Sequence, residues 1–187
     1  VCHHPNPGDA MTQRKLARRA PAAVLLAALA LVCVRAAGVW INTSPSIPLG
    51  FYVDASGQAR IGEYVRFCPP PLPEFSMALR RGYLEQGSCA SGVAPLMKRV
   101  LAAKGDVVDI DLAGVRVNGK QLTNSVPLPV DADGNTLGPH AGGMHRVLAD
   151  GEILLMSDAD PKGFDARYFG PIQKRWVTSV IRPLFTW

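Results

Sequence analysis

The sequence has few of the features that mark a metalloprotein or a nucleic-acid-binding protein. Its four cysteines and four histidines include no Cys-x-x-Cys pair and no histidines at ligand spacing, so we expect no metal site and no cofactor. The net charge of +5 is not arranged as a basic stripe with interleaved aromatic residues, so nucleic acid is not an expected partner. The sequence also has no internal repeat.

Charged residues are scarce as well, at 19% against 48% hydrophobic residues, and this balance argues against a disordered chain. A length of 187 residues leaves room for one modest domain and an anchor. The 18 glycines and 16 prolines lie mostly after residue 42, which predicts many turns and short strands. We therefore expect a mainly β, antiparallel domain over residues 42–187.

One apolar run stands near the N-terminus. Residues 20–34 are apolar throughout, Arg35 interrupts them, and residues 36–41 continue the run. A membrane-spanning helix needs roughly 20 apolar residues. Arg35 can extend toward the interface, and Trp40 suits the membrane–water boundary. We interpret residues 20–41 as a transmembrane anchor in contact with membrane lipid.

Basic residues directly before this run predict its orientation. The cluster at residues 14–19 places residues 1–19 in the cytoplasm and residues 42–187 in the periplasm of a bacterial inner membrane, by the positive-inside rule. Met11 is a natural start, so residues 1–10 are interpreted as a non-native extension. A cleaved secretory signal peptide is the alternative, because residues 36–38 are small. The closeness of Ser46 to the run favours an uncleaved anchor.

Alternating apolar residues and turn residues predict where the strands of the outer domain lie. Asn118-Gly119 is typical of a hairpin turn. Residues 131–143 form a long loop, and we interpret His140 and His145 as surface residues. Strands are expected at 51–53, 64–67, 97–103, 107–112, 115–120, 151–156 and 176–181.

Two cysteines, Cys68 and Cys89, fall in the predicted outer region, and a proline-rich segment lies between them. In an oxidising compartment this pair could close a loop of about 20 residues and stabilise the fold by roughly 3 kcal/mol. The alternative is two unpaired thiols. We expect the disulfide, because the segment between the cysteines lacks another obvious means of holding itself, and we expect Cys33 to be free.

Three short runs carry the candidate chemistry: residues 42–50 with Ser46, residues 95–106 with Lys98, and residues 163–170. A serine hydroxyl is a poor nucleophile until a base removes its proton. Lysine can do so only when neutral, which requires its pKa to fall by some 3 units from about 10.4, or roughly 4 kcal/mol. Burial among apolar groups has that effect, and the neighbours of Lys98 on both sides are apolar.

Taken singly, these residues have ordinary explanations. An arbitrary serine or lysine is usually a solvated surface residue. Asp106 after Gly105 is more often part of a turn than a catalytic group. Asp165 and Arg167 could be a simple ion pair.

Taken together and in this order, the three runs resemble the type I signal peptidases (S26 serine peptidases), and among them the conjugative-transfer, TraF-like branch. The family's Ser-x-Ser-x-Pro motif matches residues 44–48, and Pro48, Gly50 and Tyr52 point to the conjugative branch. Its lysine motif and its Asp-x-Arg-x-x-Gly box are matched by Lys98-Arg99-Val100 with Gly105-Asp106, and by Asp165, Arg167 and Gly170.

The resemblance implies roles for these residues in a signal-peptidase-like β domain. Ser46 would attack the scissile carbonyl, and Lys98 would act as general base and then as general acid. The Ser46 backbone N–H and the Ser44 hydroxyl would form the oxyanion hole. Supporting roles fall to Asp165, Arg167, Gly105 and Asp106.

The sequence departs from the family at a position next to this box. Many members place a hydroxyl two residues before the aspartate of the box, where it orients the lysine. Here that position is Gly163. Lys98 must then be oriented by a water molecule or by Ser157.

These features predict a membrane-anchored Ser/Lys signal peptidase that processes exported precursors with small residues before the cut, a pilin precursor being the expected substrate. In this branch the acyl-enzyme is resolved by water or by a peptide amine, which would cyclise the pilin, and the sequence does not show which. One alternative is a non-catalytic, membrane-tethered assembly module of a secretion or conjugation apparatus, against which the intact Ser46 and Lys98 argue. Another is a self-cleaving Ser/Lys repressor-type protease, against which the anchor and the lack of a DNA-binding segment argue.

Overall fold

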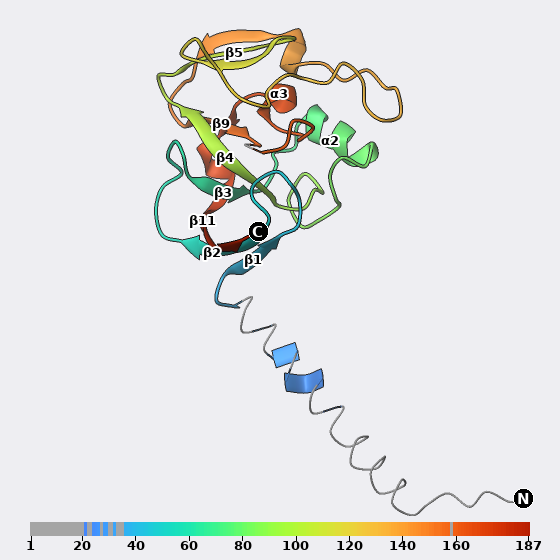
Figure 1. Cartoon of the computed structure of the whole chain (residues 1–187), viewed down its shortest axis with the longest axis vertical. Helices are drawn as coiled ribbons and strands as arrows, with labels where there is room; N and C mark the ends of the chain where they lie inside the picture. The colour runs from blue at the N-terminus through green and yellow to red at the C-terminus, as the bar shows by residue number, and fades with distance from the viewer. Residues whose placement is uncertain (1–20, 22–23, 27, 30–31, 33–35, 158) are drawn as a thin grey trace, which may run out of the picture. The chain divides into compact units, whose positions relative to one another are not determined.

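Two β-sheets dominate the computed structural model, which describes residues 21, 24–26, 28–29, 32, 36–157 and 159–187 (Figure 1). Residues 40–187 form one compact unit. The seven-stranded sheet has the order β1-β2-β11-β3-β4-β9-β10. Its strands are β1 (Val39–Asn42), β2 (Gly50–Ala55), β3 (Tyr64–Phe67), β4 (Leu96–Ala103), β9 (Glu152–Met156), β10 (Ile172–Gln173) and β11 (Val177–Thr186).

The second sheet has four strands in the order β7-β6-β5-β8, and each neighbouring pair is antiparallel. Asn118-Gly119 forms the tight turn between β6 and β7, as the sequence predicts, with both residues at positive φ. The strands are β5 (Val107–Asp111), β6 (Gly114–Val117), β7 (Lys120–Gln121) and β8 (Met144–Val147).

Short helices fill the connections between these strands. The α-helix α2 (Pro73–Arg80) begins with a proline, whose fixed φ suits the first turn, and it buries Phe75 and Ala78. The others are α3 (Ala166–Phe169) and the 3₁₀ helices η1 (His140–Gly142) and η2 (Lys174–Trp176). The sequence analysis did not predict α2, and this helix gives the proline-rich segment between the cysteines a core contact of its own.

The main core is formed by the inward faces of the central strands. Along β4, burial alternates with a period of two, so Lys98, Val100 and Ala102 share the buried face. Aromatic residues from three other elements, Phe67, Phe75 and Phe169, are buried in this structure with their rings in contact. A lysine therefore stands in line with core residues.

The predicted strands agree with the structure except at their ends. The strand predicted at 64–67 coincides with β3, whereas the last strand continues beyond the predicted 176–181 to Thr186. This extension runs through Pro183, which has no N–H for the sheet, and the register with β2 shifts between Pro183 and Phe185.

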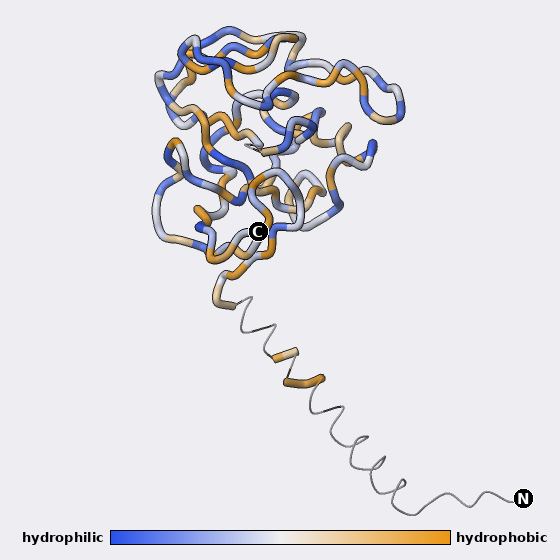
Figure 2. The backbone as a smooth tube through the Cα atoms, in the orientation of Figure 1, coloured by the Kyte–Doolittle hydropathy of each residue, from blue (hydrophilic) through white to orange (hydrophobic). Residues whose placement is uncertain are grey.

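The predicted anchor, residues 20–41, is only partly described. Residues 1–20, Cys33 and Arg35 lie outside the described residues. The described residues from 24 to 32 are hydrophobic and exposed (orange in Figure 2). Within the described ranges, no helix has the length and apolar character needed to cross a membrane.

The last residues of the predicted anchor belong to the sheet. Residues 39–41 lie in β1, which pairs with β2. The Trp40 ring, predicted to sit at a membrane boundary, lies 3.8 Å beneath the guanidinium of Arg66 on β3. Pairing with β2 and this stacking place Trp40 in the folded domain.

The two histidines predicted at the surface differ in exposure. His145 is exposed, with 75% of its side chain accessible, and its ring contacts Asp109. His140 is partly buried instead: its ring lies against Gly170, and its Nδ1 is 3.7 Å from Glu74 Oε1. The loop at residues 131–143 is thus packed on the rest of the domain at its η1 end.

The predicted disulfide between Cys68 and Cys89 is present in the structure, with the two Cα atoms 5.4 Å apart. Cys68 directly follows β3, and its N–H donates to the carbonyl of Trp176. Cys89 lies in the segment between α2 and β4, where its N–H donates to the carbonyl of Val93. The bond therefore ties this segment to the end of β3.

We expect replacement of both Cys68 and Cys89 by serine to lower the free energy of unfolding by about 3 kcal/mol, because the unfolded chain regains the freedom of a loop of 21 residues. Urea unfolding of the full chain in detergent, with and without reductant, measures the change. Reductant should destabilise the wild type and leave the double variant unchanged. Equal stability of oxidised and reduced wild type would contradict the prediction.

Candidate active site

Ser46 lies in a tight turn between β1 and β2, and one buried side chain organises that turn. Asn42, at the end of β1, is 4% exposed. Its Nδ2 donates to the carbonyls of Ser44, Ile47 and Pro48 at 2.8, 2.9 and 3.1 Å. Because these carbonyls stand on both sides of Ser46, Asn42 fixes the backbone that presents the serine.

The two serine hydroxyls of this turn are in contact. Ser44 Oγ lies 3.0 Å from Ser46 Oγ, and Ser44 Oγ donates to Asn42 Oδ1 at 3.1 Å. Beyond the serines, the buried Tyr52 donates its hydroxyl to the Pro48 carbonyl at 2.7 Å. The sequence analysis assigned no role to Asn42. Its place in the same run, two residues before Ser44, was the available signal.

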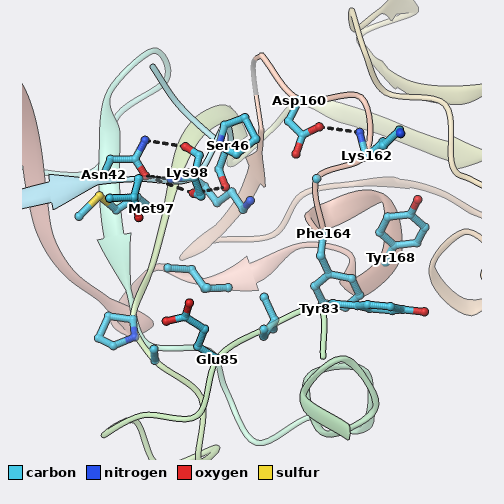
Figure 3. A pocket seen from close by; sticks show the side chains of 18 of the residues that line it. Asn42, Ser46, Tyr83, Glu85, Met97, Lys98, Asp160, Lys162, Phe164 and Tyr168 are labelled. Carbon is cyan, nitrogen blue, oxygen red and sulfur yellow. Dashed lines mark hydrogen bonds between the residues drawn. The ribbon is translucent and has the colours of Figure 1, made fainter. Parts of the chain in front are cut away.

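Lys98 reaches the same site from β4. Its residue is 3% exposed, and its Nζ donates to Ser157 Oγ at 2.8 Å. Ser46 and Lys98 both line a pocket of about 600 Å³ (Figure 3). The structure thus brings together the two residues that the sequence analysis proposed as nucleophile and base.

Ser157 is the residue that orients Lys98, a role for which the sequence allowed either a water molecule or this side chain. It directly follows β9, and the β4–β9 register, which pairs Arg99 with Met156, continues to place Lys98 opposite Ser157. Gly163 explains why its hydroxyl fits: a Cβ at residue 163 would come 2.3 Å from Ser157 Oγ. Because Gly163 has no side chain, there is room beside it for the Ser157 hydroxyl.

Asp165 and Arg167 form a fully buried pair behind Ser157. Arg167 Nε and Nη2 donate to the two Asp165 carboxylate oxygens, each at 2.8 Å, and Asp165 Oδ2 accepts from Ser157 N at 3.0 Å. Arg167 Nη1 also donates to the carbonyl of Pro161 at 2.6 Å. The pair therefore holds the backbone of Ser157, and through it the hydroxyl that contacts Lys98.

Two other predicted supporting residues, Gly105 and Asp106, do not line the pocket. Asp106 Oδ2 accepts from Ala103 N at 2.9 Å, and Gly105 has a φ of 89°. Both residues form the turn from β4 to β5, and Asp106 Oδ1 also accepts from Asn118. Gly105 and Asp106 therefore stabilise this turn, and the structure gives Asp106 the turn role that is usual for an aspartate after a glycine.

The wall of the pocket away from Asn42 and Met97 is aromatic (Figure 3). The Tyr83 and Phe164 ring centroids are 6.0 Å apart, and Phe164 stacks on Tyr168 at 5.5 Å. The Tyr83 hydroxyl donates to the Asp131 carboxylate, which lowers the pKa of Asp131 to about 2. Burial, followed by the contact with Asp131, raises the pKa of Tyr83. The carboxylate is therefore ionised and the phenol protonated at neutral pH.

Sequence reasoning missed Tyr83, Asp131 and Tyr168. Tyr83 and Asp131 are 48 residues apart, so their contact depends on how two connecting segments meet in three dimensions. Among the described residues, no group of three or more His, Cys, Asp or Glu side chains could hold a metal ion.

Comparisons with known proteins identify the family of this chain. The family model of signal peptidase, peptidase S26, matches residues 13–185. A plasmid transfer protein TraF of Escherichia coli is 43% identical over 177 residues, which cover 92% of this chain and 99% of that protein. A conjugal transfer protein TraF of Agrobacterium tumefaciens (strain 15955) is 36% identical over 167 residues, covering 88% and 92% of the two chains.

Among solved structures, a signal peptidase I from Enterococcus faecalis V583 matches with a TM-score of 0.36 and 14% identity, over 67% of this chain and 98% of that one. The family assignment rests on the sequence comparisons, since the matched model spans nearly the whole chain and the TraF relatives are similar along most of their length. This chain therefore belongs to the signal peptidase family, peptidase S26.

Proposed function

We propose that this protein is a membrane-anchored Ser/Lys endopeptidase that cuts exported precursors, with a pilin precursor as its substrate. The observation that carries the proposal is the arrangement of Ser46 and Lys98 in one pocket, with the lysine amine buried and directed by Ser157. The relatives are plasmid and conjugal transfer proteins by name, which supports a conjugative substrate.

The first half of the reaction needs only groups that line this pocket. Neutral Lys98 takes the proton of Ser46 Oγ as that oxygen attacks the scissile carbonyl. The negative charge that develops on the carbonyl oxygen is met by the Ser46 N–H and by the Ser44 hydroxyl, which turns from its present acceptor. Lys98, now an ammonium, donates its proton to the departing amine, and an ester on Ser46 remains.

The second half reuses the same base. Neutral Lys98 accepts a proton from the molecule that attacks the ester, and the Ser46 oxygen leaves with a proton returned from the lysine. Water as the attacking molecule gives a free carboxylate, whereas a peptide amine gives a new amide and, within one chain, a cyclic pilin. The mass of the product distinguishes the two, because cyclisation retains no added water.

The anchor predicted over residues 20–41 would then end before residues 39–41, which lie in β1, and would hold the pocket close to the membrane that delivers the substrate. Ser46 follows β1 by only four residues, so the nucleophile stands directly after the apolar segment. We place the catalytic domain in the periplasm and the basic N-terminus in the cytoplasm, on the positive-inside rule. The disulfide between Cys68 and Cys89 supports an oxidising compartment.

The test of the mechanism is removal of the nucleophile or the base. Ser46→Ala and Lys98→Met should each lower kcat/KM by roughly 10³-fold or more. Lys98→Arg should do likewise, because arginine stays charged. Exposed Lys104, changed to methionine, is the matched control and should keep full activity. Cleavage of a pilin precursor in detergent, followed by mass spectrometry, is the assay.

Retained cleavage by the Ser46→Ala protein would overturn the proposed mechanism. A membrane-tethered assembly module predicts a different outcome, in which Ser46→Ala supports conjugation as well as the wild type does. Conjugation frequency in cells carrying each variant separates these two hypotheses.

Exchange of the hydroxyl between residues 157 and 163 tests how the base is oriented. Ser157→Ala should lower kcat by roughly 10- to 100-fold, since Lys98 loses a hydrogen-bond partner. Gly163→Ser alone should also be harmful, because its Cβ would meet Ser157 Oγ. The double variant Ser157→Ala/Gly163→Ser should recover much of the lost kcat with little change in KM. A double variant no better than Ser157→Ala would contradict this role.

The pH dependence of kcat/KM tests which group is the base. Activity should rise with pH, because only neutral Lys98 accepts the Ser46 proton. Since its side chain is buried, we expect the rising limb well below lysine's ordinary pKa of about 10.4. If kcat/KM instead rose at a pH of about 6.5, and this rise disappeared in a His140→Gln or His145→Gln variant, the base would be a histidine.

A further inference from the structure

One loop supplies part of the lining of the pocket that also contains Ser46 and Lys98. Residues 128–137, which we name the wall loop, connect β7 with β8 and contribute four lining residues to the pocket. Of these residues, Leu137 is buried and Ala132 is exposed. The four are Leu128, Asp131, Ala132 and Leu137.

Two tyrosine hydroxyls form hydrogen bonds with this loop. Tyr83 donates to the Asp131 carboxylate, and the Tyr168 hydroxyl accepts from Leu128 N at 2.9 Å. Phe164 contacts both phenol rings (Figure 3). A cluster of three aromatic rings therefore forms part of the pocket surface, and its two hydroxyls contact the wall loop.

Asp131 is the point about which the loop folds. Its Oδ1 accepts from Asp133 N and Asn135 N at 2.9 and 2.8 Å. Arg81 lies 3.7 Å from the other carboxylate oxygen and donates to the carbonyl of Thr136 at 3.1 Å. The Asp131 side chain is only 4% exposed. A loop with this many contacts to one carboxylate has a defined position relative to Tyr83.

We propose that the wall loop, held by the hydroxyls of Tyr83 and Tyr168, determines the size of the substrate side chain that the pocket accepts. The inference rests on the proposed function, in which a peptide lies between the serine turn and this loop. The serine turn is fixed by Asn42 and cannot yield without moving the nucleophile. The wall loop is held by the hydroxyls of Tyr83 and Tyr168 and by Arg81, none of which is a proposed catalytic group, so this loop can set the width of the pocket.

Removing one hydroxyl at a time tests the proposal. The probes are a fluorogenic peptide spanning the pilin-precursor junction, and copies in which each of three residues on either side of the cut becomes leucine or phenylalanine. Tyr83→Phe and Tyr168→Phe should each raise kcat/KM at least fivefold for the bulky peptides that the wild type rejects, through KM. The parent peptide is measured alongside, and the ratio of kcat/KM for the bulky copies to that for the parent should rise at least fivefold.

Ala132→Leu supplies the opposite change, since it adds volume to a lining position. This variant should lower kcat/KM for the bulkier peptides at least fivefold more than for the parent. The matched control is Ala113→Leu, an exposed position in the turn between β5 and β6. Asp111→Asn, which breaks a carboxylate–arginine contact on the second sheet, is the control for loss of a polar contact. Both controls should follow the wild type.

Binding measured in a Ser46→Ala background separates this inference from the proposed chemistry. Dissociation constants for the same peptides, measured by fluorescence anisotropy, need no cleavage. If the wild type cuts no peptide but Tyr83→Phe still improves binding of the bulky copies at least fivefold, the proposed function fails and the inference holds. An unchanged size preference in Tyr83→Phe, Tyr168→Phe and Ala132→Leu, or no binding of any peptide, would overturn the inference.

Discussion

The hydrogen bond from Lys98 Nζ to Ser157 Oγ is the interaction on which the rest of the site depends. A lysine on the inner face of β4 has left bulk water, and burying an ammonium without compensation is costly. A hydroxyl can serve it in both charge states, because it accepts from the ammonium and can accept from or donate to the neutral amine. The buried Asp165–Arg167 pair, which is joined by two hydrogen bonds, keeps the Ser157 backbone in place. Such a pair is poor evidence for stability, and its contact with Ser157 gives it a positioning role.

The same hydroxyl shows how a family motif can change while the lysine amine keeps a hydroxyl partner. In many members of the family, the hydroxyl that orients the lysine stands two residues before the aspartate of the Asp-x-Arg-x-x-Gly box. That position is Gly163 in this chain. Here the hydroxyl stands at the end of β9, and the glycine leaves room for it. The geometric requirement is a hydroxyl near the lysine amine, and two neighbouring backbone positions can satisfy it. A glycine at the motif position is therefore compatible with an intact site when Ser157 is present.

The sequence predicted those parts of the structure that short-range rules determine. The Asn118-Gly119 turn, the strand at β3 and the run that presents Ser46 each depend on neighbouring residues. The choice between Ser157 and water could not be made, because it depends on the β4–β9 register across 59 residues. Sequence reasoning gave Tyr83 and Asp131 no role in the site, since their contact forms only where two segments 48 residues apart meet. The helix α2 was not predicted because a proline-rich run precedes it, yet the last proline of that run, Pro73, begins the helix.

The two residues of the proposed catalytic pair are therefore held in place by different kinds of contact. Asn42 reaches carbonyls at most six residues away, so the serine turn is a local structure that forms wherever β1 and β2 pair. Lys98 depends on β4, β9 and the buried pair, so its position reflects the packing of the whole domain. Core substitutions should then act on the base more than on the nucleophile. Activity would be lost through a misplaced amine while the serine turn keeps its geometry.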